Sequence, residues 1–162
     1  MLPLLVIGLA LGAVPAESDE EPVGWILTAD LGALPRAALE LEAPMMPTGS
    51  AFISLGYPLS VGLNLSGRIP GPQVAGGWRV YLFGQGPWGM FIDGRLMANL
   101  YFPADPQAPS PIIIPGGGLT LGLNVKVWHL VVSPGLSLFY VPDPTVSSAV
   151  LPALRLALGG WN

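Results

Sequence analysis

Paired acidic side chains are the first feature of this chain that could carry out chemistry. Glu40 and Glu42 lie two residues apart, a spacing that places both carboxylates on one face of a β-strand. Two carboxylates on one face suit general acid/base catalysis or calcium binding. Asp93 and Arg95 have the same spacing with opposite charges. Because arginines elsewhere share the same strand face, we interpret these groups as partners in ion pairs.

The only histidine, His129, stands beside Trp128 and four residues before Ser133. A serine nucleophile needs an adjacent base and an acid that orients this base. No carboxylate lies near His129 in the sequence, so one from another strand would have to complete such a site. We interpret His129 as an interfacial residue at a tight turn and predict no catalytic residue. The chain has no cysteine, which excludes thiolate metal sites, and we predict no metal or cofactor.

The glycine run at 116–118 is the only stretch that resembles a phosphate-binding loop. Such a loop needs a lysine and a helix directly after the glycines, and neither follows, so we predict an ordinary loop. The apolar residues before it, 111–114, are predicted to pack on the rim of the fold or to form an exposed tip. A net charge of −4 without a basic run argues against nucleic-acid binding.

The elements that would position these groups follow from a period-two pattern. Apolar residues alternate with small, polar or charged residues along most of the chain, as in strands with two different faces. The aliphatic residues define one face, and every charge within these segments falls on the other. We predict that these charges form a network of ion pairs inside a barrel; its members are Asp30, Glu40, Glu42, Arg68, Arg79, Asp93, Arg95, Lys126 and Arg155.

Nine segments carry this alternation, and most have the nine to eleven residues that cross a bilayer as a tilted strand. Because single-chain barrels of bacterial membranes have even strand numbers, we predict eight strands, with ten as the alternative. We expect the short segment 37–43 to be absorbed by a neighbour. The segments are 24–34, 37–43, 49–57, 60–69, 77–85, 88–102, 118–127, 130–141 and 149–161.

The connections between these segments alternate in length, as in an up-and-down barrel with turns at one rim and loops at the other. We predict tight connections at 35, 58, 87 and 128. Longer ones are predicted at 44–48, 70–76, 103–117 and 142–148.

Three observations favour lipid outside the barrel over an apolar core inside it. Charged residues make up 10% of the chain, against about 25% in soluble proteins. The polar face is rich in glycine, alanine and serine, which fit a narrow interior. Aromatic residues of the apolar face gather at strand ends, as in the girdles of membrane barrels; they are Trp25, Tyr57, Trp78, Trp88, Phe102 and Tyr140.

The start of the chain differs from the rest. Residues 2–14 form an almost unbroken apolar run, and Val14-Pro15-Ala16 provides small residues for cleavage. We therefore predict a signal peptide over 1–16, with a retained anchor as the alternative. An acidic leader over 17–23 and a barrel domain over 24–162 complete the predicted organisation.

The alternation, the girdles, the signal peptide and the closing segment 154–162 together resemble the small eight-stranded outer-membrane β-barrels of bacteria. The resemblance covers 24–162 and implies location in the bacterial outer membrane, contact with membrane lipids and recognition of the last strand by the outer-membrane assembly machinery. Trp161 departs from the family pattern because it shares the face of Arg155 rather than of Leu158. We expect a bulge at Gly159-Gly160 to restore the register.

The resulting functional hypothesis is a barrel with a filled interior and a structural or loop-mediated role, without enzymatic activity. Three alternatives remain open at this stage. One is a secreted soluble barrel that binds an apolar ligand, as lipocalins do, with the apolar face inside. The second is a lipid-modifying enzyme that uses His129, because some barrels of this kind are hydrolases or acyltransferases. The third is a small conducting pore.

Overall fold

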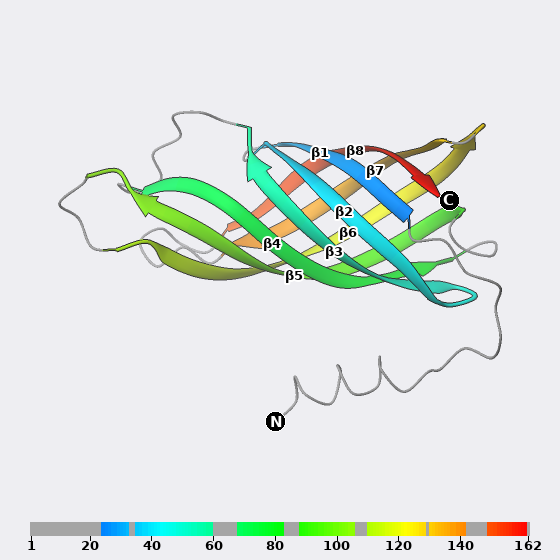
Figure 1. Cartoon of the computed structure of the whole chain (residues 1–162), viewed down its shortest axis with the longest axis horizontal. Helices are drawn as coiled ribbons and strands as arrows, with labels where there is room; N and C mark the ends of the chain where they lie inside the picture. Colours follow the sequence, from blue (N-terminus) through cyan, green and yellow to red (C-terminus); the bar gives the residue numbers. More distant parts are fainter. Residues whose placement is uncertain are drawn as a thin grey trace, which may run out of the picture.

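The computed structural model of the chain describes residues 24–32, 35–59, 68–82, 88–105, 110–128, 130–141 and 149–161. The predicted signal peptide (1–16) and acidic leader (17–23) lie outside these residues. The alternating segments form eight strands in one closed barrel (Figure 1). Their bounds are β1 (Gly24–Gly32), β2 (Arg36–Met46), β3 (Gly49–Pro58), β4 (Arg68–Tyr81), β5 (Gly89–Pro103), β6 (Ile112–Val127), β7 (Leu130–Val141) and β8 (Ala149–Trp161).

Each strand pairs antiparallel with the next strand in the sequence, and β1 closes the barrel by pairing with β8. Closure gives every strand a paired neighbour on each side, so the backbone N–H and C=O groups along the shared ladders find partners without water. This confirms the prediction of an up-and-down barrel with eight strands rather than ten. No described segment forms a helix long and apolar enough to cross a membrane.

The segment 37–43, which we expected to be absorbed, is instead the centre of β2. Leu39 pairs with Leu27 of β1 and with Leu55 of β3. The segment looked short because both of its flanks had been assigned to connections. These flanks, from Arg36 onward and up to Met46, pair with β3 as well.

The reduction from nine segments to eight takes place in β4. Residues 70–76, predicted as a long connection, lie within this strand and join the end of the fourth predicted segment to the fifth. Pro70, Pro72 and nearby glycines give this stretch the composition of a loop. A register shift between Pro70 and Gln73 in the pairing with β5 accommodates the prolines, since a bulge relieves the need for every N–H to join the ladder.

The glycine run at 116–118 and residues 112–114 also lie in a strand rather than in the predicted loop, because β6 begins at Ile112. Gly118 is paired with Phe139, and a Cβ atom on Gly118 would lie 2.8 Å from Cδ1 of that ring. The phenylalanine ring therefore covers the strand where the glycine leaves space.

The last strand differs from its prediction in one respect. β8 keeps a continuous register with both neighbours through Gly159 and Gly160, so the expected bulge at these glycines is absent from its pairing. A Cβ atom on Gly159 would lie 2.9 Å from Cγ1 of Ile26. These glycines therefore allow close approach of β1 rather than a change of register.

Apolar residues lie on the outer face of the barrel and polar or small residues on the inner face, in the alternation that the sequence predicts. Apart from Lys126 near the end of β6, the exposed large side chains on the described strands are apolar, and most alternate with buried residues. Examples are Leu96 (79% exposed), Ile113 (68%) and Ile53 (63%). Leu121 and Leu123 are exposed, whereas Asn124 between Leu123 and Val125 is 3% exposed. The apolar face therefore points outward.

The two rims differ in the length of their connections. One rim carries Gly24, Trp161, the two-residue turn at 47–48 and the connections from β4 to β5 and from β6 to β7. Trp128 has a φ angle of 58°, in the left-handed region that two-residue hairpins use. We call this the turn rim. The opposite loop rim carries the connections after β1, β3, β5 and β7.

The predicted alternation of tight and long connections is therefore wrong in part. The connection within 44–48 is a two-residue turn, whereas the connections predicted as tight at 58 and 87 extend over 59–67 and 82–88. The connection at 33–35 is short, although it lies on the loop rim.

Candidate functional site: the charged interior

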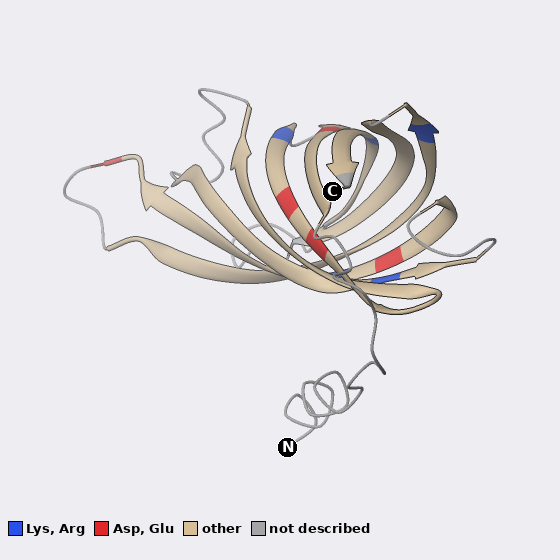
Figure 2. Cartoon of the chain, turned by 45° about the vertical axis from the view of Figure 1, so that its right-hand side comes forward, with Lys and Arg blue, Asp and Glu red and all other residues tan. Residues whose placement is uncertain are grey.

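Charged residues from four strands meet inside the barrel. Figure 2 shows acidic and basic residues as bands on the strands around the barrel. Six of them are at most 5% exposed and form one group, which we call the central ion-pair cluster. Its members are Glu40 and Glu42 of β2, Arg79 of β4, Asp93 and Arg95 of β5, and Arg155 of β8.

Glu40 is the acidic centre of this cluster. Its carboxylate lies 2.6 Å from Nη2 of Arg79, 3.1 Å from Nη2 of Arg155 and 3.7 Å from Nη1 of Arg95. These three arginines come from β4, β8 and β5. A single carboxylate therefore connects strands that are not neighbours in the sheet.

Arg79 is the basic centre. Its guanidinium contacts Glu40 and Glu42 from β2 and also lies 3.1 Å from Asp93 of β5. Asp93 in turn lies 2.7 Å from Nη2 of Arg95. Because Arg79 reaches three carboxylates with two nitrogens, the ion pairs extend across the interior from β2 to β5.

Neutral donors satisfy the second carboxylate of β2. Ser50 donates a hydrogen bond to Glu42, and the Tyr81 hydroxyl donates another at 2.5 Å. Together with Arg79, these donors occupy the oxygens of Glu42. Both glutamates are thus engaged by arginines and hydroxyls, which does not fit the calcium site considered from their spacing. In the described part of the chain, no group of three or more potential ligands could hold a metal ion.

Aromatic rings line the cluster. The Arg79 guanidinium carbon lies 4.4 Å from the ring centre of Phe91 and 5.2 Å from that of Phe52, and Arg95 lies 4.9 Å from Phe52. A cation above a ring face is stabilised by the quadrupole of the ring. Both rings cover a paired glycine of the next strand, Phe91 on Gly122 and Phe52 on Gly77.

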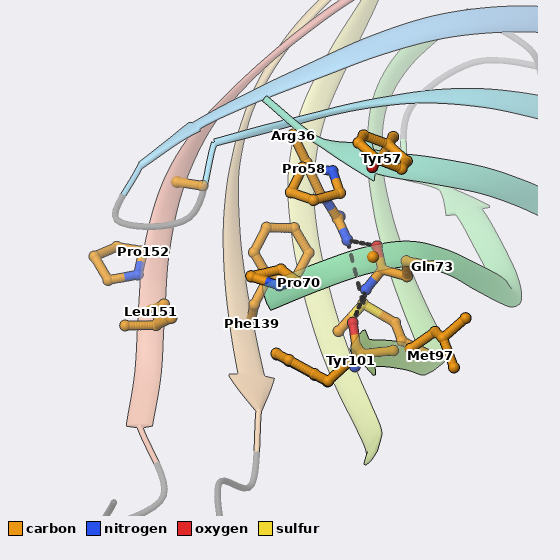
Figure 3. Close-up of a pocket in the computed structure, with 14 residues that line it drawn as sticks. Arg36, Tyr57, Pro58, Pro70, Gln73, Met97, Tyr101, Phe139, Leu151 and Pro152 are labelled. Carbon is orange, nitrogen blue, oxygen red and sulfur yellow. Dashed lines mark hydrogen bonds between the residues drawn. The ribbon is translucent and has the colours of Figure 1, made fainter. Parts of the chain in front are cut away.

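A second ion pair lies nearer the loop rim. Nε of Arg36 is 2.7 Å from Oδ2 of Asp30, and its guanidinium lies 4.0 Å from the ring centre of Phe139. Arg36 also donates to Gln73, which donates to Asn99 at 2.5 Å (Figure 3). Arg36 was missed in the sequence because it follows Pro35 and was assigned to a turn. Its even spacing from Glu40 is the signal that could have found it.

Three residues that were considered in the sequence belong to neither group of ion pairs in the described part of the chain. Lys126 is exposed, with Nζ 5.1 Å from the ring centre of Trp88, because β6 carries it past the enclosed part of the interior. The side chain of Arg68 and all of His129 lie outside the described residues. Ser133, considered with His129, is 2% exposed and faces the interior.

The charges of the two groups balance. They comprise four carboxylates, at 30, 40, 42 and 93, and four guanidinium groups, at 36, 79, 95 and 155. A buried ion costs several kcal/mol unless partners compensate it. Mutual neutralisation therefore makes this dense set of charges compatible with a narrow barrel.

The predicted aromatic residues separate by type between the rims. Trp25, Trp78 and Trp88 lie near the turn rim, where exposed Trp128 and the backbone of Trp161 are also found. On the loop rim, the residues are Tyr57, Phe102 and Tyr140, which are 39–60% exposed. Trp128 is 89% exposed and was not included in the predicted girdles.

Comparisons with known proteins bear on the fold alone. No protein-family model and no curated protein sequence matches the chain. Among solved structures, the N-terminal β-barrel domain of Pseudomonas aeruginosa OprF superposes with a TM-score of 0.69 at 10% identity, covering 90% of this chain and 100% of that one. A de novo designed transmembrane β-barrel gives a TM-score of 0.46 at 12% identity, with coverage of 91% and 100%. The chain thus shares the eight-stranded barrel fold of the OprF domain.

Proposed function

We propose that this chain is an integral β-barrel of the bacterial outer membrane, with an interior closed by side chains and a structural or loop-mediated role. The main observation in support is that the described strands have an apolar outer face and a charged inner face. Apart from Lys126 near the turn rim, the large exposed side chains of the described strands are apolar, and the ion pairs lie within. The shared fold with the OprF barrel domain supports the same proposal.

The outer face favours hydrocarbon as its surroundings. Soluble monomers rarely expose contiguous apolar patches larger than a few hundred Å2. Here exposed apolar residues occur on each of the eight strands, and a tryptophan-rich rim stands opposite a tyrosine- and phenylalanine-containing rim. Aromatic residues at both rims match the two interfaces of a bilayer.

The soluble-barrel alternative requires the opposite arrangement. A carrier of apolar ligands in water would place Leu121, Leu123 and Val125 inside, but these residues are 41–47% exposed. Buried Thr120 and Asn124 occupy the inner positions of the same strand. The orientation of the two faces contradicts that alternative.

The interior favours a closed barrel over a conducting pore. An eight-stranded barrel is just wide enough for side chains to fill it. The central ion-pair cluster spans this width from β2 to β5, and the rings of Phe52 and Phe91 line it. In planar bilayers we expect no stable conductance from the purified protein, and steady single-channel currents would contradict a closed interior.

The proposed orientation follows from the two rims. Outer-membrane barrels have short periplasmic turns and longer extracellular loops. The turn rim would therefore face the periplasm, and the loop rim would present its connections to the exterior. This arrangement leaves the loops as the part available for interaction with partners, and the assembly machinery as the partner of the closing strand.

The membrane proposal is tested by lipid accessibility of neighbouring residues. In Leu121→Cys the thiol would face lipid, and in Thr120→Cys it would face the interior. A thiol-reactive probe dissolved in the bilayer should label the first variant and spare the second. Fractionation and heat-modifiable gel mobility should place the folded protein in the outer membrane. A soluble periplasmic protein would contradict the proposal.

A further inference from the structure

The barrel wall has an uneven height at the loop rim. β1, β2 and β3 contain 9–11 residues, whereas β4, β5 and β6 contain 14–16. Figure 1 shows β4 and β5 extending well past the end of β3. The ladder between β3 and β4 stops at the pair Gly56↔Gln73, although β4 extends back to Arg68. Among the residues that the structure describes, a lateral step in the wall therefore separates these strands.

The other side of the step is formed by β8. Its ladder with β1 stops at Gly32↔Ala153, although β8 begins four residues earlier at Ala149. The short strands β1, β2 and β3 thus lie between two taller walls. The ends of β2 and β3, at Arg36 and Pro58, form the base of the step.

A pocket of about 70 Å3 lies at this step (Figure 3). Its inner part is lined by Met97, Phe139 and Ala153, which belong to the buried apolar cluster of the barrel. Tyr57 and Pro152 belong to its lining as well, and both lie on the outer face of the wall. The pocket therefore connects the interior with the lateral surface rather than only with the loop end.

The surface beside the pocket remains apolar. Ile69 of β4, Ile113 of β6 and Val150 of β8 are 47–68% exposed and lie in the taller walls. Exposed residues of this kind belong to the lipid-facing band of a membrane barrel. The lateral side of the step therefore faces the hydrocarbon or its immediate boundary.

Prolines border the interrupted ladder. Pro58 is the last residue of β3. Pro70 and Pro72 lie in the part of β4 that is not paired with β3. An unpaired N–H group in hydrocarbon costs several kcal/mol. Proline has no N–H, so these residues reduce the number of unpaired donors that such a step exposes to lipid.

We propose that this pocket holds the end of one alkyl chain of a bilayer lipid, which enters sideways through the step between β3 and β4. A single water needs about 15 Å3 of such space, so a pocket of this size admits the last few carbons of a chain and excludes a whole lipid. The guanidinium of Arg36 is paired with Asp30 and stacked on Phe139. Gln73 and Asn99 also line the pocket, and their side chains are engaged in hydrogen bonds, Gln73 with Arg36 and with Asn99. The surface that remains for an apolar guest is the apolar part of the lining, which includes Phe139 and Leu151. This inference rests on the proposed membrane location.

The test uses the full protein in phosphatidylcholine vesicles that contain a phospholipid with a photoactivatable diazirine at the end of one acyl chain. After illumination, mass spectrometry of the digested protein locates the label. We expect label at Met97 and Leu151 in the pocket as well as at outer residues such as Leu39. In Ala153→Leu, pocket labelling should fall about tenfold, equivalent to about 1.4 kcal/mol of binding free energy.

Two further variants keep this test decisive. Leu151→Trp fills the pocket from a half-buried position. This variant replaces Ala153→Leu in the test if Ala153→Leu fails to fold. Ala43→Leu adds the same atoms to the outer face of β2 and should leave pocket labelling unchanged. Equal pocket labelling in the parent and both filling variants overturns the inference. So does labelling of the pocket by a free diazirine fatty acid but not by the phospholipid.

The same experiment separates this inference from the membrane proposal. Label at outer residues without label in the pocket overturns the lipid pocket alone. Absence of label from the whole outer face contradicts the membrane location itself.

Discussion

At the scale of single residues, Glu40 has the largest number of charged partners among the carboxylates of the central ion-pair cluster. It approaches three arginines from three strands, whereas Glu42 has one arginine and two hydroxyl donors. Removing one partner of a buried pair leaves an uncompensated charge, which is costlier than losing the attraction itself. The loss of Glu40 would leave Arg155 without its ion-pair partner in the cluster.

We therefore predict that Glu40→Ala lowers the free energy of unfolding by about 3–5 kcal/mol. Urea unfolding of the barrel in lipid vesicles, followed by gel mobility or tryptophan fluorescence, measures this change. Lys126→Ala is the matched control, because exposed Lys126 lies apart from the cluster, and its effect should stay within about 0.5 kcal/mol. Equal effects of the two substitutions would contradict a stabilising role of the cluster.

At the scale of strands, alternation was sufficient to predict the inner and outer faces. It gave nine segments, and the even strand number followed only from the rule for single-chain bacterial barrels. Patterns such as Leu119, Leu121 and Leu123 against Thr120, Gly122 and Asn124 define both faces without any tertiary information. The limits of strands were harder to predict. Parts of β4 and β6 are rich in proline and glycine, as loops are. Only their pairing with β5 in the structure shows that these parts are strands.

The interior residues were predictable as a set but not as partners. Period two places Asp30 and Glu40 on one face, whereas register and closure decide which arginine each one meets. Asp30 pairs with Arg36, which had been assigned to a turn, and Lys126 extends beyond the enclosed interior. Such distinctions depend on where each strand ends, which periodicity alone does not determine.

Two adjacent glycines of β4 allow a test of how closely this strand packs against its neighbours. A Cβ atom on Gly77 would collide with the carbonyl oxygen of Gly94 and lie 2.7 Å from Cζ of Phe52. On Gly76 its nearest contact would be 3.7 Å, an ordinary distance. We predict that Gly77→Ala destabilises the barrel by about 1–3 kcal/mol through overpacking. Gly76→Ala should be neutral or slightly stabilising, since alanine restricts the unfolded chain.

Urea unfolding of the two variants under identical conditions measures this difference. The substitutions add the same methyl group to neighbouring positions, so β-propensity cancels in the comparison. Similar stability of the two variants would contradict the close approach of Gly77 to Gly94 of β5 and to the Phe52 ring.

At the scale of the whole molecule, the outer face should respond to charge according to depth in the membrane. Leu121 lies near the middle of β6, and Val127 ends that strand at the turn rim on the same exposed face. An arginine on the lipid face costs about 2–4 kcal/mol at the bilayer midplane and about 0–1 kcal/mol near the interface. Thus we predict a larger loss of stability for Leu121→Arg than for Val127→Arg.

Unfolding of the two variants in vesicles under identical conditions measures both losses. If water surrounded the barrel, both arginines would be solvated and the two variants would unfold alike. A larger loss of stability in Leu121→Arg than in Val127→Arg is therefore evidence for a bilayer around the barrel. It does not depend on the ion pairs of the interior.

The orientation of the barrel connects its shape to its role. Thr48 is exposed in the two-residue turn between β2 and β3, on the turn rim, and Ser110 is exposed just before β6, on the loop rim. Short turns face the periplasm in outer-membrane barrels, and longer loops face the exterior. A membrane-impermeant thiol reagent added to intact cells should therefore label Ser110→Cys and spare Thr48→Cys. In permeabilised cells the reagent reaches both rims, so both variants should be labelled. The chain has no native cysteine, so only the introduced thiols can react. The reverse pattern in intact cells would place the loops inside the envelope and remove the basis for a loop-mediated role at the cell surface.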